Sequence, residues 1–263
     1  MAKSEVAVKE EKSTALALSM EDMGADAGGG FEGVTAKDVT VPYLSILQSG
    51  SPQVKRGDPA QIPGAAEGDI FNTATKEVYK EGLRLIPCAF QKRYVEWVDR
   101  DQGGGFVASH ADEAILNQTT KDEKGKARLA NGNVIVTTAY HYVLVIRPDG
   151  SFYPAIMAMA STQLKKSRDW FGLMQGLKIK TSRGMVTPST FSHSYKCGTT
   201  TQKNNFGTWQ GWDLSAPAML ESNELYAIAK AFSQSVNEGT VKAADPVSAD
   251  VQESADAGES KHF

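Results

Sequence analysis

The chain has 263 residues with a formal net charge of −3 at pH 7, and 41% of its residues are hydrophobic. A chain of this length forms one large domain or two small ones. No apolar run is long enough to span a membrane and no signal peptide is recognisable. The sequence therefore predicts a cytoplasmic protein without a membrane partner, and composition argues against the membrane and secreted classes.

The small net charge conceals a segregation of charge along the chain. Residues 1–33 hold seven acids and three lysines, and residues 236–263 hold six acids and two lysines. Residues 34–235 therefore carry a net charge of +5. Because the two ends are poor in apolar residues, we expect both to be disordered and residues 34–235 to form the folded domain. Acidic ends of this kind are typical of interaction tails, and a role in solubility alone is the alternative.

The first half of the predicted domain begins with a helical pattern and continues with strands. Apolar residues within 43–47 fit a short amphipathic helix. Residues 83–90 and 94–98 predict two paired strands around a turn at 91–93. The polar segment 111–128 predicts a short helix and an exposed loop.

The second half carries the clearest β pattern of the chain. The hairpin signal Asn131-Gly132 precedes a Val-, Thr- and Tyr-rich segment, 134–146, which predicts a long strand. A turn at 148–150 leads back into a second strand at 152–159. Apolar residues at helical spacing then predict a helix over 161–177, with its lysines on the opposite face.

Two further strands and a helix complete the predicted domain. The strands are expected at 190–196 and 205–214, on either side of a polar turn at 198–204. An amphipathic helix is expected over 221–235. Together the elements predict an α+β domain with an antiparallel β-rich core, which we expect to be an OB-fold-like barrel with an inserted helix and a C-terminal helix.

The segment between Ala160 and Trp212 has the composition of a single-strand-binding surface. It holds eight Lys/Arg, a single acid and seven aromatic residues. Backbone phosphates require positive charge at intervals, and unpaired bases require flat faces on which to stack. We predict that the DNA-binding residues are Lys165, Lys166, Arg168, Lys178, Lys180, Arg183 and Lys203, with Trp170 and Trp209 as stacking residues.

A second basic and aromatic patch occurs at the predicted hairpin around 91–93. Lys92, Arg93 and Tyr94 combine two cations with an aromatic ring, so we expect them to extend the same groove. A surface hairpin without a ligand is the alternative. Phe171 lies on the apolar face of the predicted helix, which favours a place in the core.

Catalysis and metal binding have little support in the sequence. The four histidines are isolated, and no zinc spacing, phosphate-binding loop or serine elbow is present. Asp99 and Asp101 could hold magnesium, but a solvated charged turn explains them equally well. Cys88 and Cys197 are expected to be reduced core thiols. We therefore expect no enzyme activity, no metal and no cofactor.

The aromatic β-rich core, the basic segment and the acidic tail that ends in Phe263 together resemble phage-encoded single-stranded DNA-binding proteins of the podophage type. The resemblance implies an oligonucleotide-binding barrel and a tail that competes with DNA and docks on phage or host replication proteins. It assigns partner binding to Phe263. The tail departs from the family pattern, because its acids are sparse and Lys261 and His262 precede the terminal residue.

These observations lead to the hypothesis of a sequence-independent single-stranded DNA-binding protein in phage replication or recombination. It would act in the host bacterial cytoplasm, and self-association is compatible with the sequence. One alternative is a virion or scaffold protein that uses the basic and aromatic segment as a subunit interface, since such residues are also enriched at interfaces. Another is a single-strand annealing protein.

Overall fold

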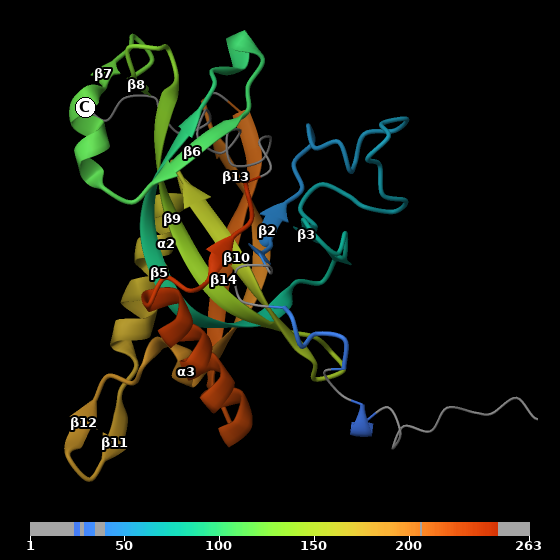
Figure 1. Cartoon of the computed structure of the whole chain (residues 1–263), viewed down its shortest axis with the longest axis vertical. Helices are drawn as coiled ribbons and strands as arrows, with labels where there is room; N and C mark the ends of the chain where they lie inside the picture. Colours follow the sequence, from blue (N-terminus) through green and yellow to red (C-terminus); the bar gives the residue numbers. More distant parts are fainter. Residues whose placement is uncertain (1–23, 27–28, 35–39, 206, 247–263) are drawn as a thin grey trace, which may run out of the picture.

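A strongly curled sheet of 11 strands organises the protein (Figure 1). The computed structural model describes residues 24–26, 29–34, 40–205 and 207–246. The main strands of the sheet are β2 (Tyr43–Ile46), β3 (Ile70–Asn72), β4 (Val78–Tyr79), β5 (Leu83–Trp97), β9 (Val134–Ile146), β10 (Phe152–Ala160), β13 (His193–Asn204) and β14 (Gly207–Met219). They follow the order β14-β13-β5-β9-β10-β2-β3-β4, and the one parallel pair among them is β10 with β2.

Shorter elements surround this path. Three small strands extend the sheet beside β5 and β9: β6 (Phe106–His110), β7 (Thr120–Lys121) and β8 (Ala127–Arg128). Two separate pairs are β1 (Thr40–Val41) with β15 (Lys242–Ala243), which is parallel, and β11 (Ile179–Thr181) with β12 (Gly184–Val186), which is antiparallel. The helices are α2 (Gln163–Gly176), α3 (Asn223–Asn237) and the 3-10 helices Arg100–Gln102, Glu113–Gln118 and Thr190–Ser192.

The two faces of the curled sheet pack against different helices. Side chains from both ends of the strand order, such as Ile70 and Trp212, belong to one apolar cluster, so this cluster fills the hollow of the curl. Trp170 of α2 joins it, and α2 therefore closes the hollow. On the outer face, Ala229 and Val236 of α3 pack against side chains of β5 and β9. Figure 1 shows α2 and α3 on opposite sides of the sheet.

Two features account for the curl of the sheet: a bulge in β5 and a side-chain contact at the edge strand β14. The register of β5 with β9 shifts between Pro87 and Ala89, and a bulge of this kind bends a strand and increases its twist. At the edge, the Gln48 side chain donates to the Gln210 carbonyl oxygen and accepts from the Gln210 N–H, both at 2.9 Å. The outer strand β14 thus reaches the segment after β2 without a backbone ladder between them, and the sheet is a half-barrel.

The expected class and much of the second half are confirmed. The chain is an α+β protein with a β-rich core, an inserted helix and a C-terminal helix. The strands expected at 134–146 and 152–159 and the helices expected at 161–177 and 221–235 occur within a few residues of their expected bounds. Its main sheet is mixed instead of wholly antiparallel, and the OB-like barrel is not confirmed.

Three local predictions were wrong for physical reasons. Residues 43–46 form a strand instead of a helix, because both faces of β2 are covered and its apolar residues do not alternate with polar ones. The polar residues at 91–93 continue β5 and form no turn. Residues 198–204 likewise continue β13, where threonines pair with β14, and the turn follows at Asn204–Gly207.

The predicted boundary at residue 235 falls inside packed structure. Helix α3 continues to Asn237, and β15 then pairs with β1, so the fold extends to residue 246 at least. The remaining tail, with Phe263, and residues 1–23 lie outside the described residues. Cys88 and Cys197 are buried free thiols, as expected. Neither α2 nor α3, nor any other helix in the described ranges, is long and apolar enough to cross a membrane.

Candidate functional site

Helix α2 separates an apolar face, which closes the half-barrel, from a charged outer face. Its buried residues recur at helical spacing: Gln163, Ser167, Trp170 and Met174. Lys165 and Arg168 lie on the exposed side, and Lys166 is half-buried. None of these three cations forms an ion pair with a described residue. Their charges are therefore available to an external partner.

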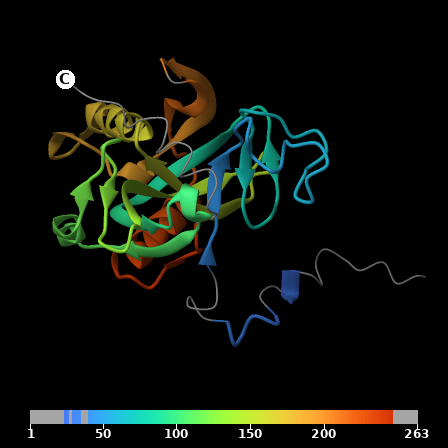
Figure 2. The same cartoon turned by 90° about the horizontal axis from the view of Figure 1, so that it is seen from above.

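The N-terminal end of α2 is tied to the hairpin formed by β13 and β14. The Gln163 Oε1 atom accepts a hydrogen bond from the Trp212 N–H at 3.0 Å, and Gln163 Nε2 donates to Gln202 Oε1 at 3.4 Å. Lys203 follows Gln202 and is exposed, and Trp209 pairs with Gln202 across the hairpin. The hairpin that carries Lys203 and Trp209 therefore lies beside α2 (Figure 2).

The C-terminal end of α2 continues directly into the β11–β12 hairpin, which projects from the body of the protein (Figure 1). Lys178 and Lys180 are both exposed, and alternation places them on one face of this hairpin. Met185 lies opposite Lys180 and is 63% exposed, and Arg183 occupies the turn. The hairpin therefore offers three cations and one apolar side chain to solvent.

The cations of α2 and of the two hairpins at its ends are together called the basic ridge: Lys165, Lys166, Arg168, Lys178, Lys180, Arg183 and Lys203. The helix between the two hairpins has 14 residues, which corresponds to a length of about 21 Å. No aspartate or glutamate occurs between Trp170 and Trp212 in the sequence. The acid-free segment thus supplies both ends of the ridge, and the exposed Asp169 lies on α2 between them.

Two of the predicted DNA-binding residues are in the core instead. Trp170 is 2% exposed, and its ring lies 5.6 Å from that of Tyr195 and 4.9 Å from that of His141. Tyr94 is also 2% exposed. Trp170 belongs to the cluster that fills the hollow, and Tyr94 is buried beside Glu113, so neither ring offers a face to a base. Trp209, the other predicted stacking residue, is half-buried.

The patch at 91–93 is divided between the two faces of the sheet, because β5 continues through it. Phe90 packs edge-on against Phe171 of α2, at 5.0 Å between ring centroids. Alternation places the exposed Lys92 on that same face, beside the basic ridge. Arg93 points to the opposite face. Lys92 therefore lies on the face of the sheet that α2 covers, and Arg93 lies on the other, so the two cations do not share one surface.

Phe90 begins the second basic and aromatic patch but is not among the predicted stacking residues. Its ring is 38% exposed although it also contacts Phe171 and His141. It lies at the edge of the α2 face, in the position that was expected for Trp170. The sequence signal for such a residue is an aromatic side chain two positions before an exposed lysine on the same strand.

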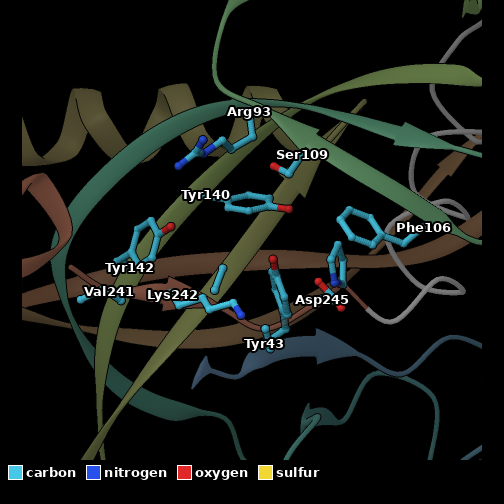
Figure 3. A pocket seen from close by; sticks show the side chains of 12 residues that line it. Tyr43, Arg93, Phe106, Ser109, Tyr140, Tyr142, Val241, Lys242 and Asp245 are labelled. Carbon is cyan, nitrogen blue, oxygen red and sulfur yellow. The ribbon is translucent and has the colours of Figure 1, made fainter. Parts of the chain in front are cut away.

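Arg93 lines a cavity of about 360 Å³ on the outer face of the sheet (Figure 3). Aromatic side chains form much of its wall: Tyr43, Phe106, Tyr140 and Tyr142. Its other side is the strap formed by residues 241–246, which is held by β15 and by the hydrogen bond from the Ala244 N–H to the Val41 carbonyl oxygen. No motif marks this cavity in the sequence, because its residues come from five separate segments.

Hydrogen bonds and burial fix the polar groups of this cavity. Arg93 Nε donates to Gln91 Oε1 at 3.1 Å, and the Tyr142 hydroxyl donates to the same oxygen at 3.1 Å. Burial raises the pKa of Tyr43, Tyr140 and Tyr142 above the ordinary tyrosine value. The three hydroxyls are therefore protonated at neutral pH; that of Tyr142 donates to Gln91, and those of Tyr43 and Tyr140 line the cavity.

His141 and Asp99 have structural partners. His141 Nε2 lies 2.8 Å from Ser167 Oγ, but both side chains are buried and out of reach of a substrate. Asp99 is ion-paired with Arg128, which accounts for its place in a charged turn. The described ranges contain no group of three or more His, Cys, Asp or Glu that could hold a metal ion.

The structure defines an α+β protein with a half-barrel sheet, a basic ridge on one face and a donor-rich cavity on the other. The family model described as Pam3 phage gp34-like protein matches residues 9–242, which is most of the chain. The protein belongs to this phage protein family, and the phage part of the expected resemblance is thereby supported. No curated protein and no solved structure matches the chain.

Proposed function

We propose that this protein binds single-stranded DNA along the basic ridge, without sequence readout, during phage replication or recombination. The observation that carries the proposal is the path of the acid-free segment from Trp170 to Trp212. It folds so that its exposed cations continue those of α2 at both ends of the helix. Cations without carboxylate partners bind phosphates by releasing condensed counterions, which requires no particular base sequence.

Apolar and aromatic side chains beside the ridge would contact the bases. Phe90 and the half-buried Trp209 present aromatic rings near α2, and each base–aromatic stack is worth about 1–3 kcal/mol. Met185 offers an apolar contact at the end of the projecting hairpin. The OB-like barrel remains the finer fold hypothesis within this proposal, and the contact of Gln48 with Gln210 supports its near-closure.

A titration with poly-dT at several salt concentrations tests the proposal. We expect tight binding at low salt, quenching of tryptophan fluorescence, and a slope of log affinity against log salt of about −0.7 for each phosphate contact. Replacing the three hairpin cations by glutamine (Lys178, Lys180 and Arg183) should reduce the magnitude of that slope by about 2. Lys230→Gln, an exposed cation on α3, is the matched control and should leave the slope unchanged.

Two results would contradict the proposal. One is an absence of binding at low salt. The other is binding whose affinity does not depend on salt, because the proposed affinity arises from counterion release. Equal slopes for the hairpin variant and for Lys230→Gln would place the nucleic acid elsewhere on the protein.

A subunit of a phage particle is the second candidate function, and one apolar patch favours it. Met219 is 64% exposed and Tyr226 is 38% exposed. Phe191 joins them, since its ring lies 5.4 Å from that of Tyr226 and the Leu220 N–H bonds the Ser192 carbonyl oxygen. Exposed apolar patches of this kind often mark contacts between proteins. Stoichiometric recovery of the chain in purified particles would support this function over DNA binding.

A further inference from the structure

The cavity around Arg93 is separate from the basic ridge, because the two lie on opposite faces of the sheet. Its volume of about 360 Å³ falls within the range of small-molecule sites, about 300–1,000 Å³. It is lined by β-strand residues on one side and by the strap of residues 241–246 on the other. A ligand in it would therefore contact the strap and the sheet together.

The cavity has more hydrogen-bond donors than the protein itself uses. The Tyr43 hydroxyl is buried and has no hydrogen-bond partner among the described residues, and the residue as a whole is 3% exposed. Figure 3 shows this hydroxyl directed into the cavity, toward Tyr140. A buried hydroxyl without a partner costs free energy, which a bound acceptor would recover.

Arg93 adds a charged donor to the same space. Its guanidinium bonds the Gln91 side-chain oxygen through Nε and one terminal nitrogen, and forms no ion pair with a described residue. Arginine carries five N–H donors, so Arg93 has donors beyond those two that can bind a planar oxyanion. Lys242 contributes a second positive charge at the strap, against the one carboxylate of Asp245. The cavity therefore favours a ligand with an anionic group.

The wall of the cavity favours a ligand that also carries a flat ring. The rings of Tyr43 and Tyr140 pack edge-to-face with centroids 5.7 Å apart, and Phe106 lies beside them (Figure 3). Aromatic walls bind flat rings by stacked or edge-on contacts. A small phosphate ester of a ring compound satisfies the aromatic wall, the unpartnered hydroxyl and the guanidinium at once, whereas a bare oxyanion leaves the wall unused.

We infer that the cavity binds a nucleoside monophosphate, with the phosphate on Arg93 and the base against the tyrosine rings. The inference does not rest on the DNA-binding function, since none of the cavity residues belongs to the basic ridge. The strap that carries β15 forms part of the site. Residues 241–246 accordingly belong to a binding site, although they follow the last helix of the fold.

Isothermal titration calorimetry of the full chain tests the inference with three ligands. Thymidine monophosphate should bind saturably with one site per chain. Thymidine and inorganic phosphate should each bind at least about ten-fold more weakly, because each satisfies half of the cavity. Arg93→Gln should lower the affinity for thymidine monophosphate at least about ten-fold, and Tyr43→Phe, which removes only the unpartnered hydroxyl, about five-fold.

Two controls separate this site from the ridge. Lys196→Gln removes an exposed cation of β13 that does not line the cavity, and the hairpin variant removes Lys178, Lys180 and Arg183. Both should bind thymidine monophosphate as the wild type does, and Arg93→Gln should keep its affinity for poly-dT. Thermal unfolding of each variant establishes that it folds, and Tyr43→Phe provides an independent test if Arg93→Gln does not.

Three outcomes would overturn the inference. The first is an absence of saturable binding of thymidine monophosphate, whatever happens with poly-dT. The second is equal affinity for phosphate and for the nucleotide, which would leave a site for a simple oxyanion. The third is a loss of nucleotide binding in the hairpin variant with none in Arg93→Gln, which would place the nucleotide on the ridge.

Discussion

A decrease in pH from 7.5 to 5 should destabilise the fold through one buried imidazole. His141 is 1% exposed and is surrounded by the rings of Phe90, Trp170 and Phe171. Burial lowers its pKa from 6.5 to about 3. The unfolded chain therefore takes up a proton below pH 6.5 that the folded protein refuses until about pH 3, so the contribution to stability is complete above pH 6.5 and is lost as the pH falls.

The size of the effect follows from the shift. Each pH unit between the two pKa values costs about 1.4 kcal/mol, because one more proton is bound by the unfolded chain than by the folded one. Between pH 6.5 and 5 the free energy of unfolding should decrease by about 2 kcal/mol from this residue alone. His193, whose pKa burial also lowers, changes stability in the same direction.

Urea unfolding followed by tryptophan fluorescence at pH 7.5, 6 and 5 measures the effect. His141→Asn removes the titrating group and leaves His193 in place, so the difference between the pH dependences of the two proteins isolates His141. His141→Phe serves the same purpose if the asparagine variant does not fold. Identical pH dependence in the wild type and the variant would refute the assignment of a buried neutral imidazole.

Three further predictions concern a turn, the projecting hairpin and the tail. Gly82→Ala should lower the free energy of unfolding by more than Gly150→Ala does. Both glycines have φ near +80°, but only a Cβ at residue 82 would meet a strand carbonyl oxygen, at 2.5 Å. The expected decrease for Gly82→Ala, measured by urea unfolding, is about 1–3 kcal/mol or more. Met185→Ser should weaken poly-dT binding in a fluorescence titration. Met219→Ser should not, because Met219 is equally exposed but lies off the ridge. Equal losses of poly-dT affinity in the two variants would show that Met185 does not contact the DNA. Deleting residues 247–263 should raise the affinity for poly-dT at low salt, because a competing acidic segment is removed, and unchanged affinity would limit it to a role in solubility.

The strands that the sequence predicts well are those whose signals are local. β9 follows an Asn-Gly turn and is rich in β-branched residues, and β10 returns from it through a second short turn. Strands β2 and β5 were predicted less well, because the burial of their residues depends on elements that are distant in the sequence. β2 is covered on both faces, and the polar segment of β5 stays in the strand because it pairs with β9. No local pattern distinguishes these cases from a helix or a turn.

In the candidate site, too, some features can be predicted from the neighbouring sequence and others depend on contacts between distant segments. The exposure of Lys165, Lys178 and Lys180 follows from helical and strand periodicity, and the structure has all three exposed. The burial of Trp170 does not follow from local periodicity. It depends on contacts with Tyr195 and His141, whose strands come together only in the folded protein. The face on which Arg93 lies can be predicted only if β5 is known to be continuous, since successive residues of a strand point to opposite faces.

The contact between Gln48 and Gln210 also affects how the protein can meet a second copy of itself. An outer strand normally offers free N–H and carbonyl groups on which a strand of another chain can pair, a common route to aggregation. Here one amide side chain occupies both backbone groups of Gln210 and takes the place of a neighbouring strand residue. Strand addition at this position would first have to displace that amide, so the curl protects the edge it creates.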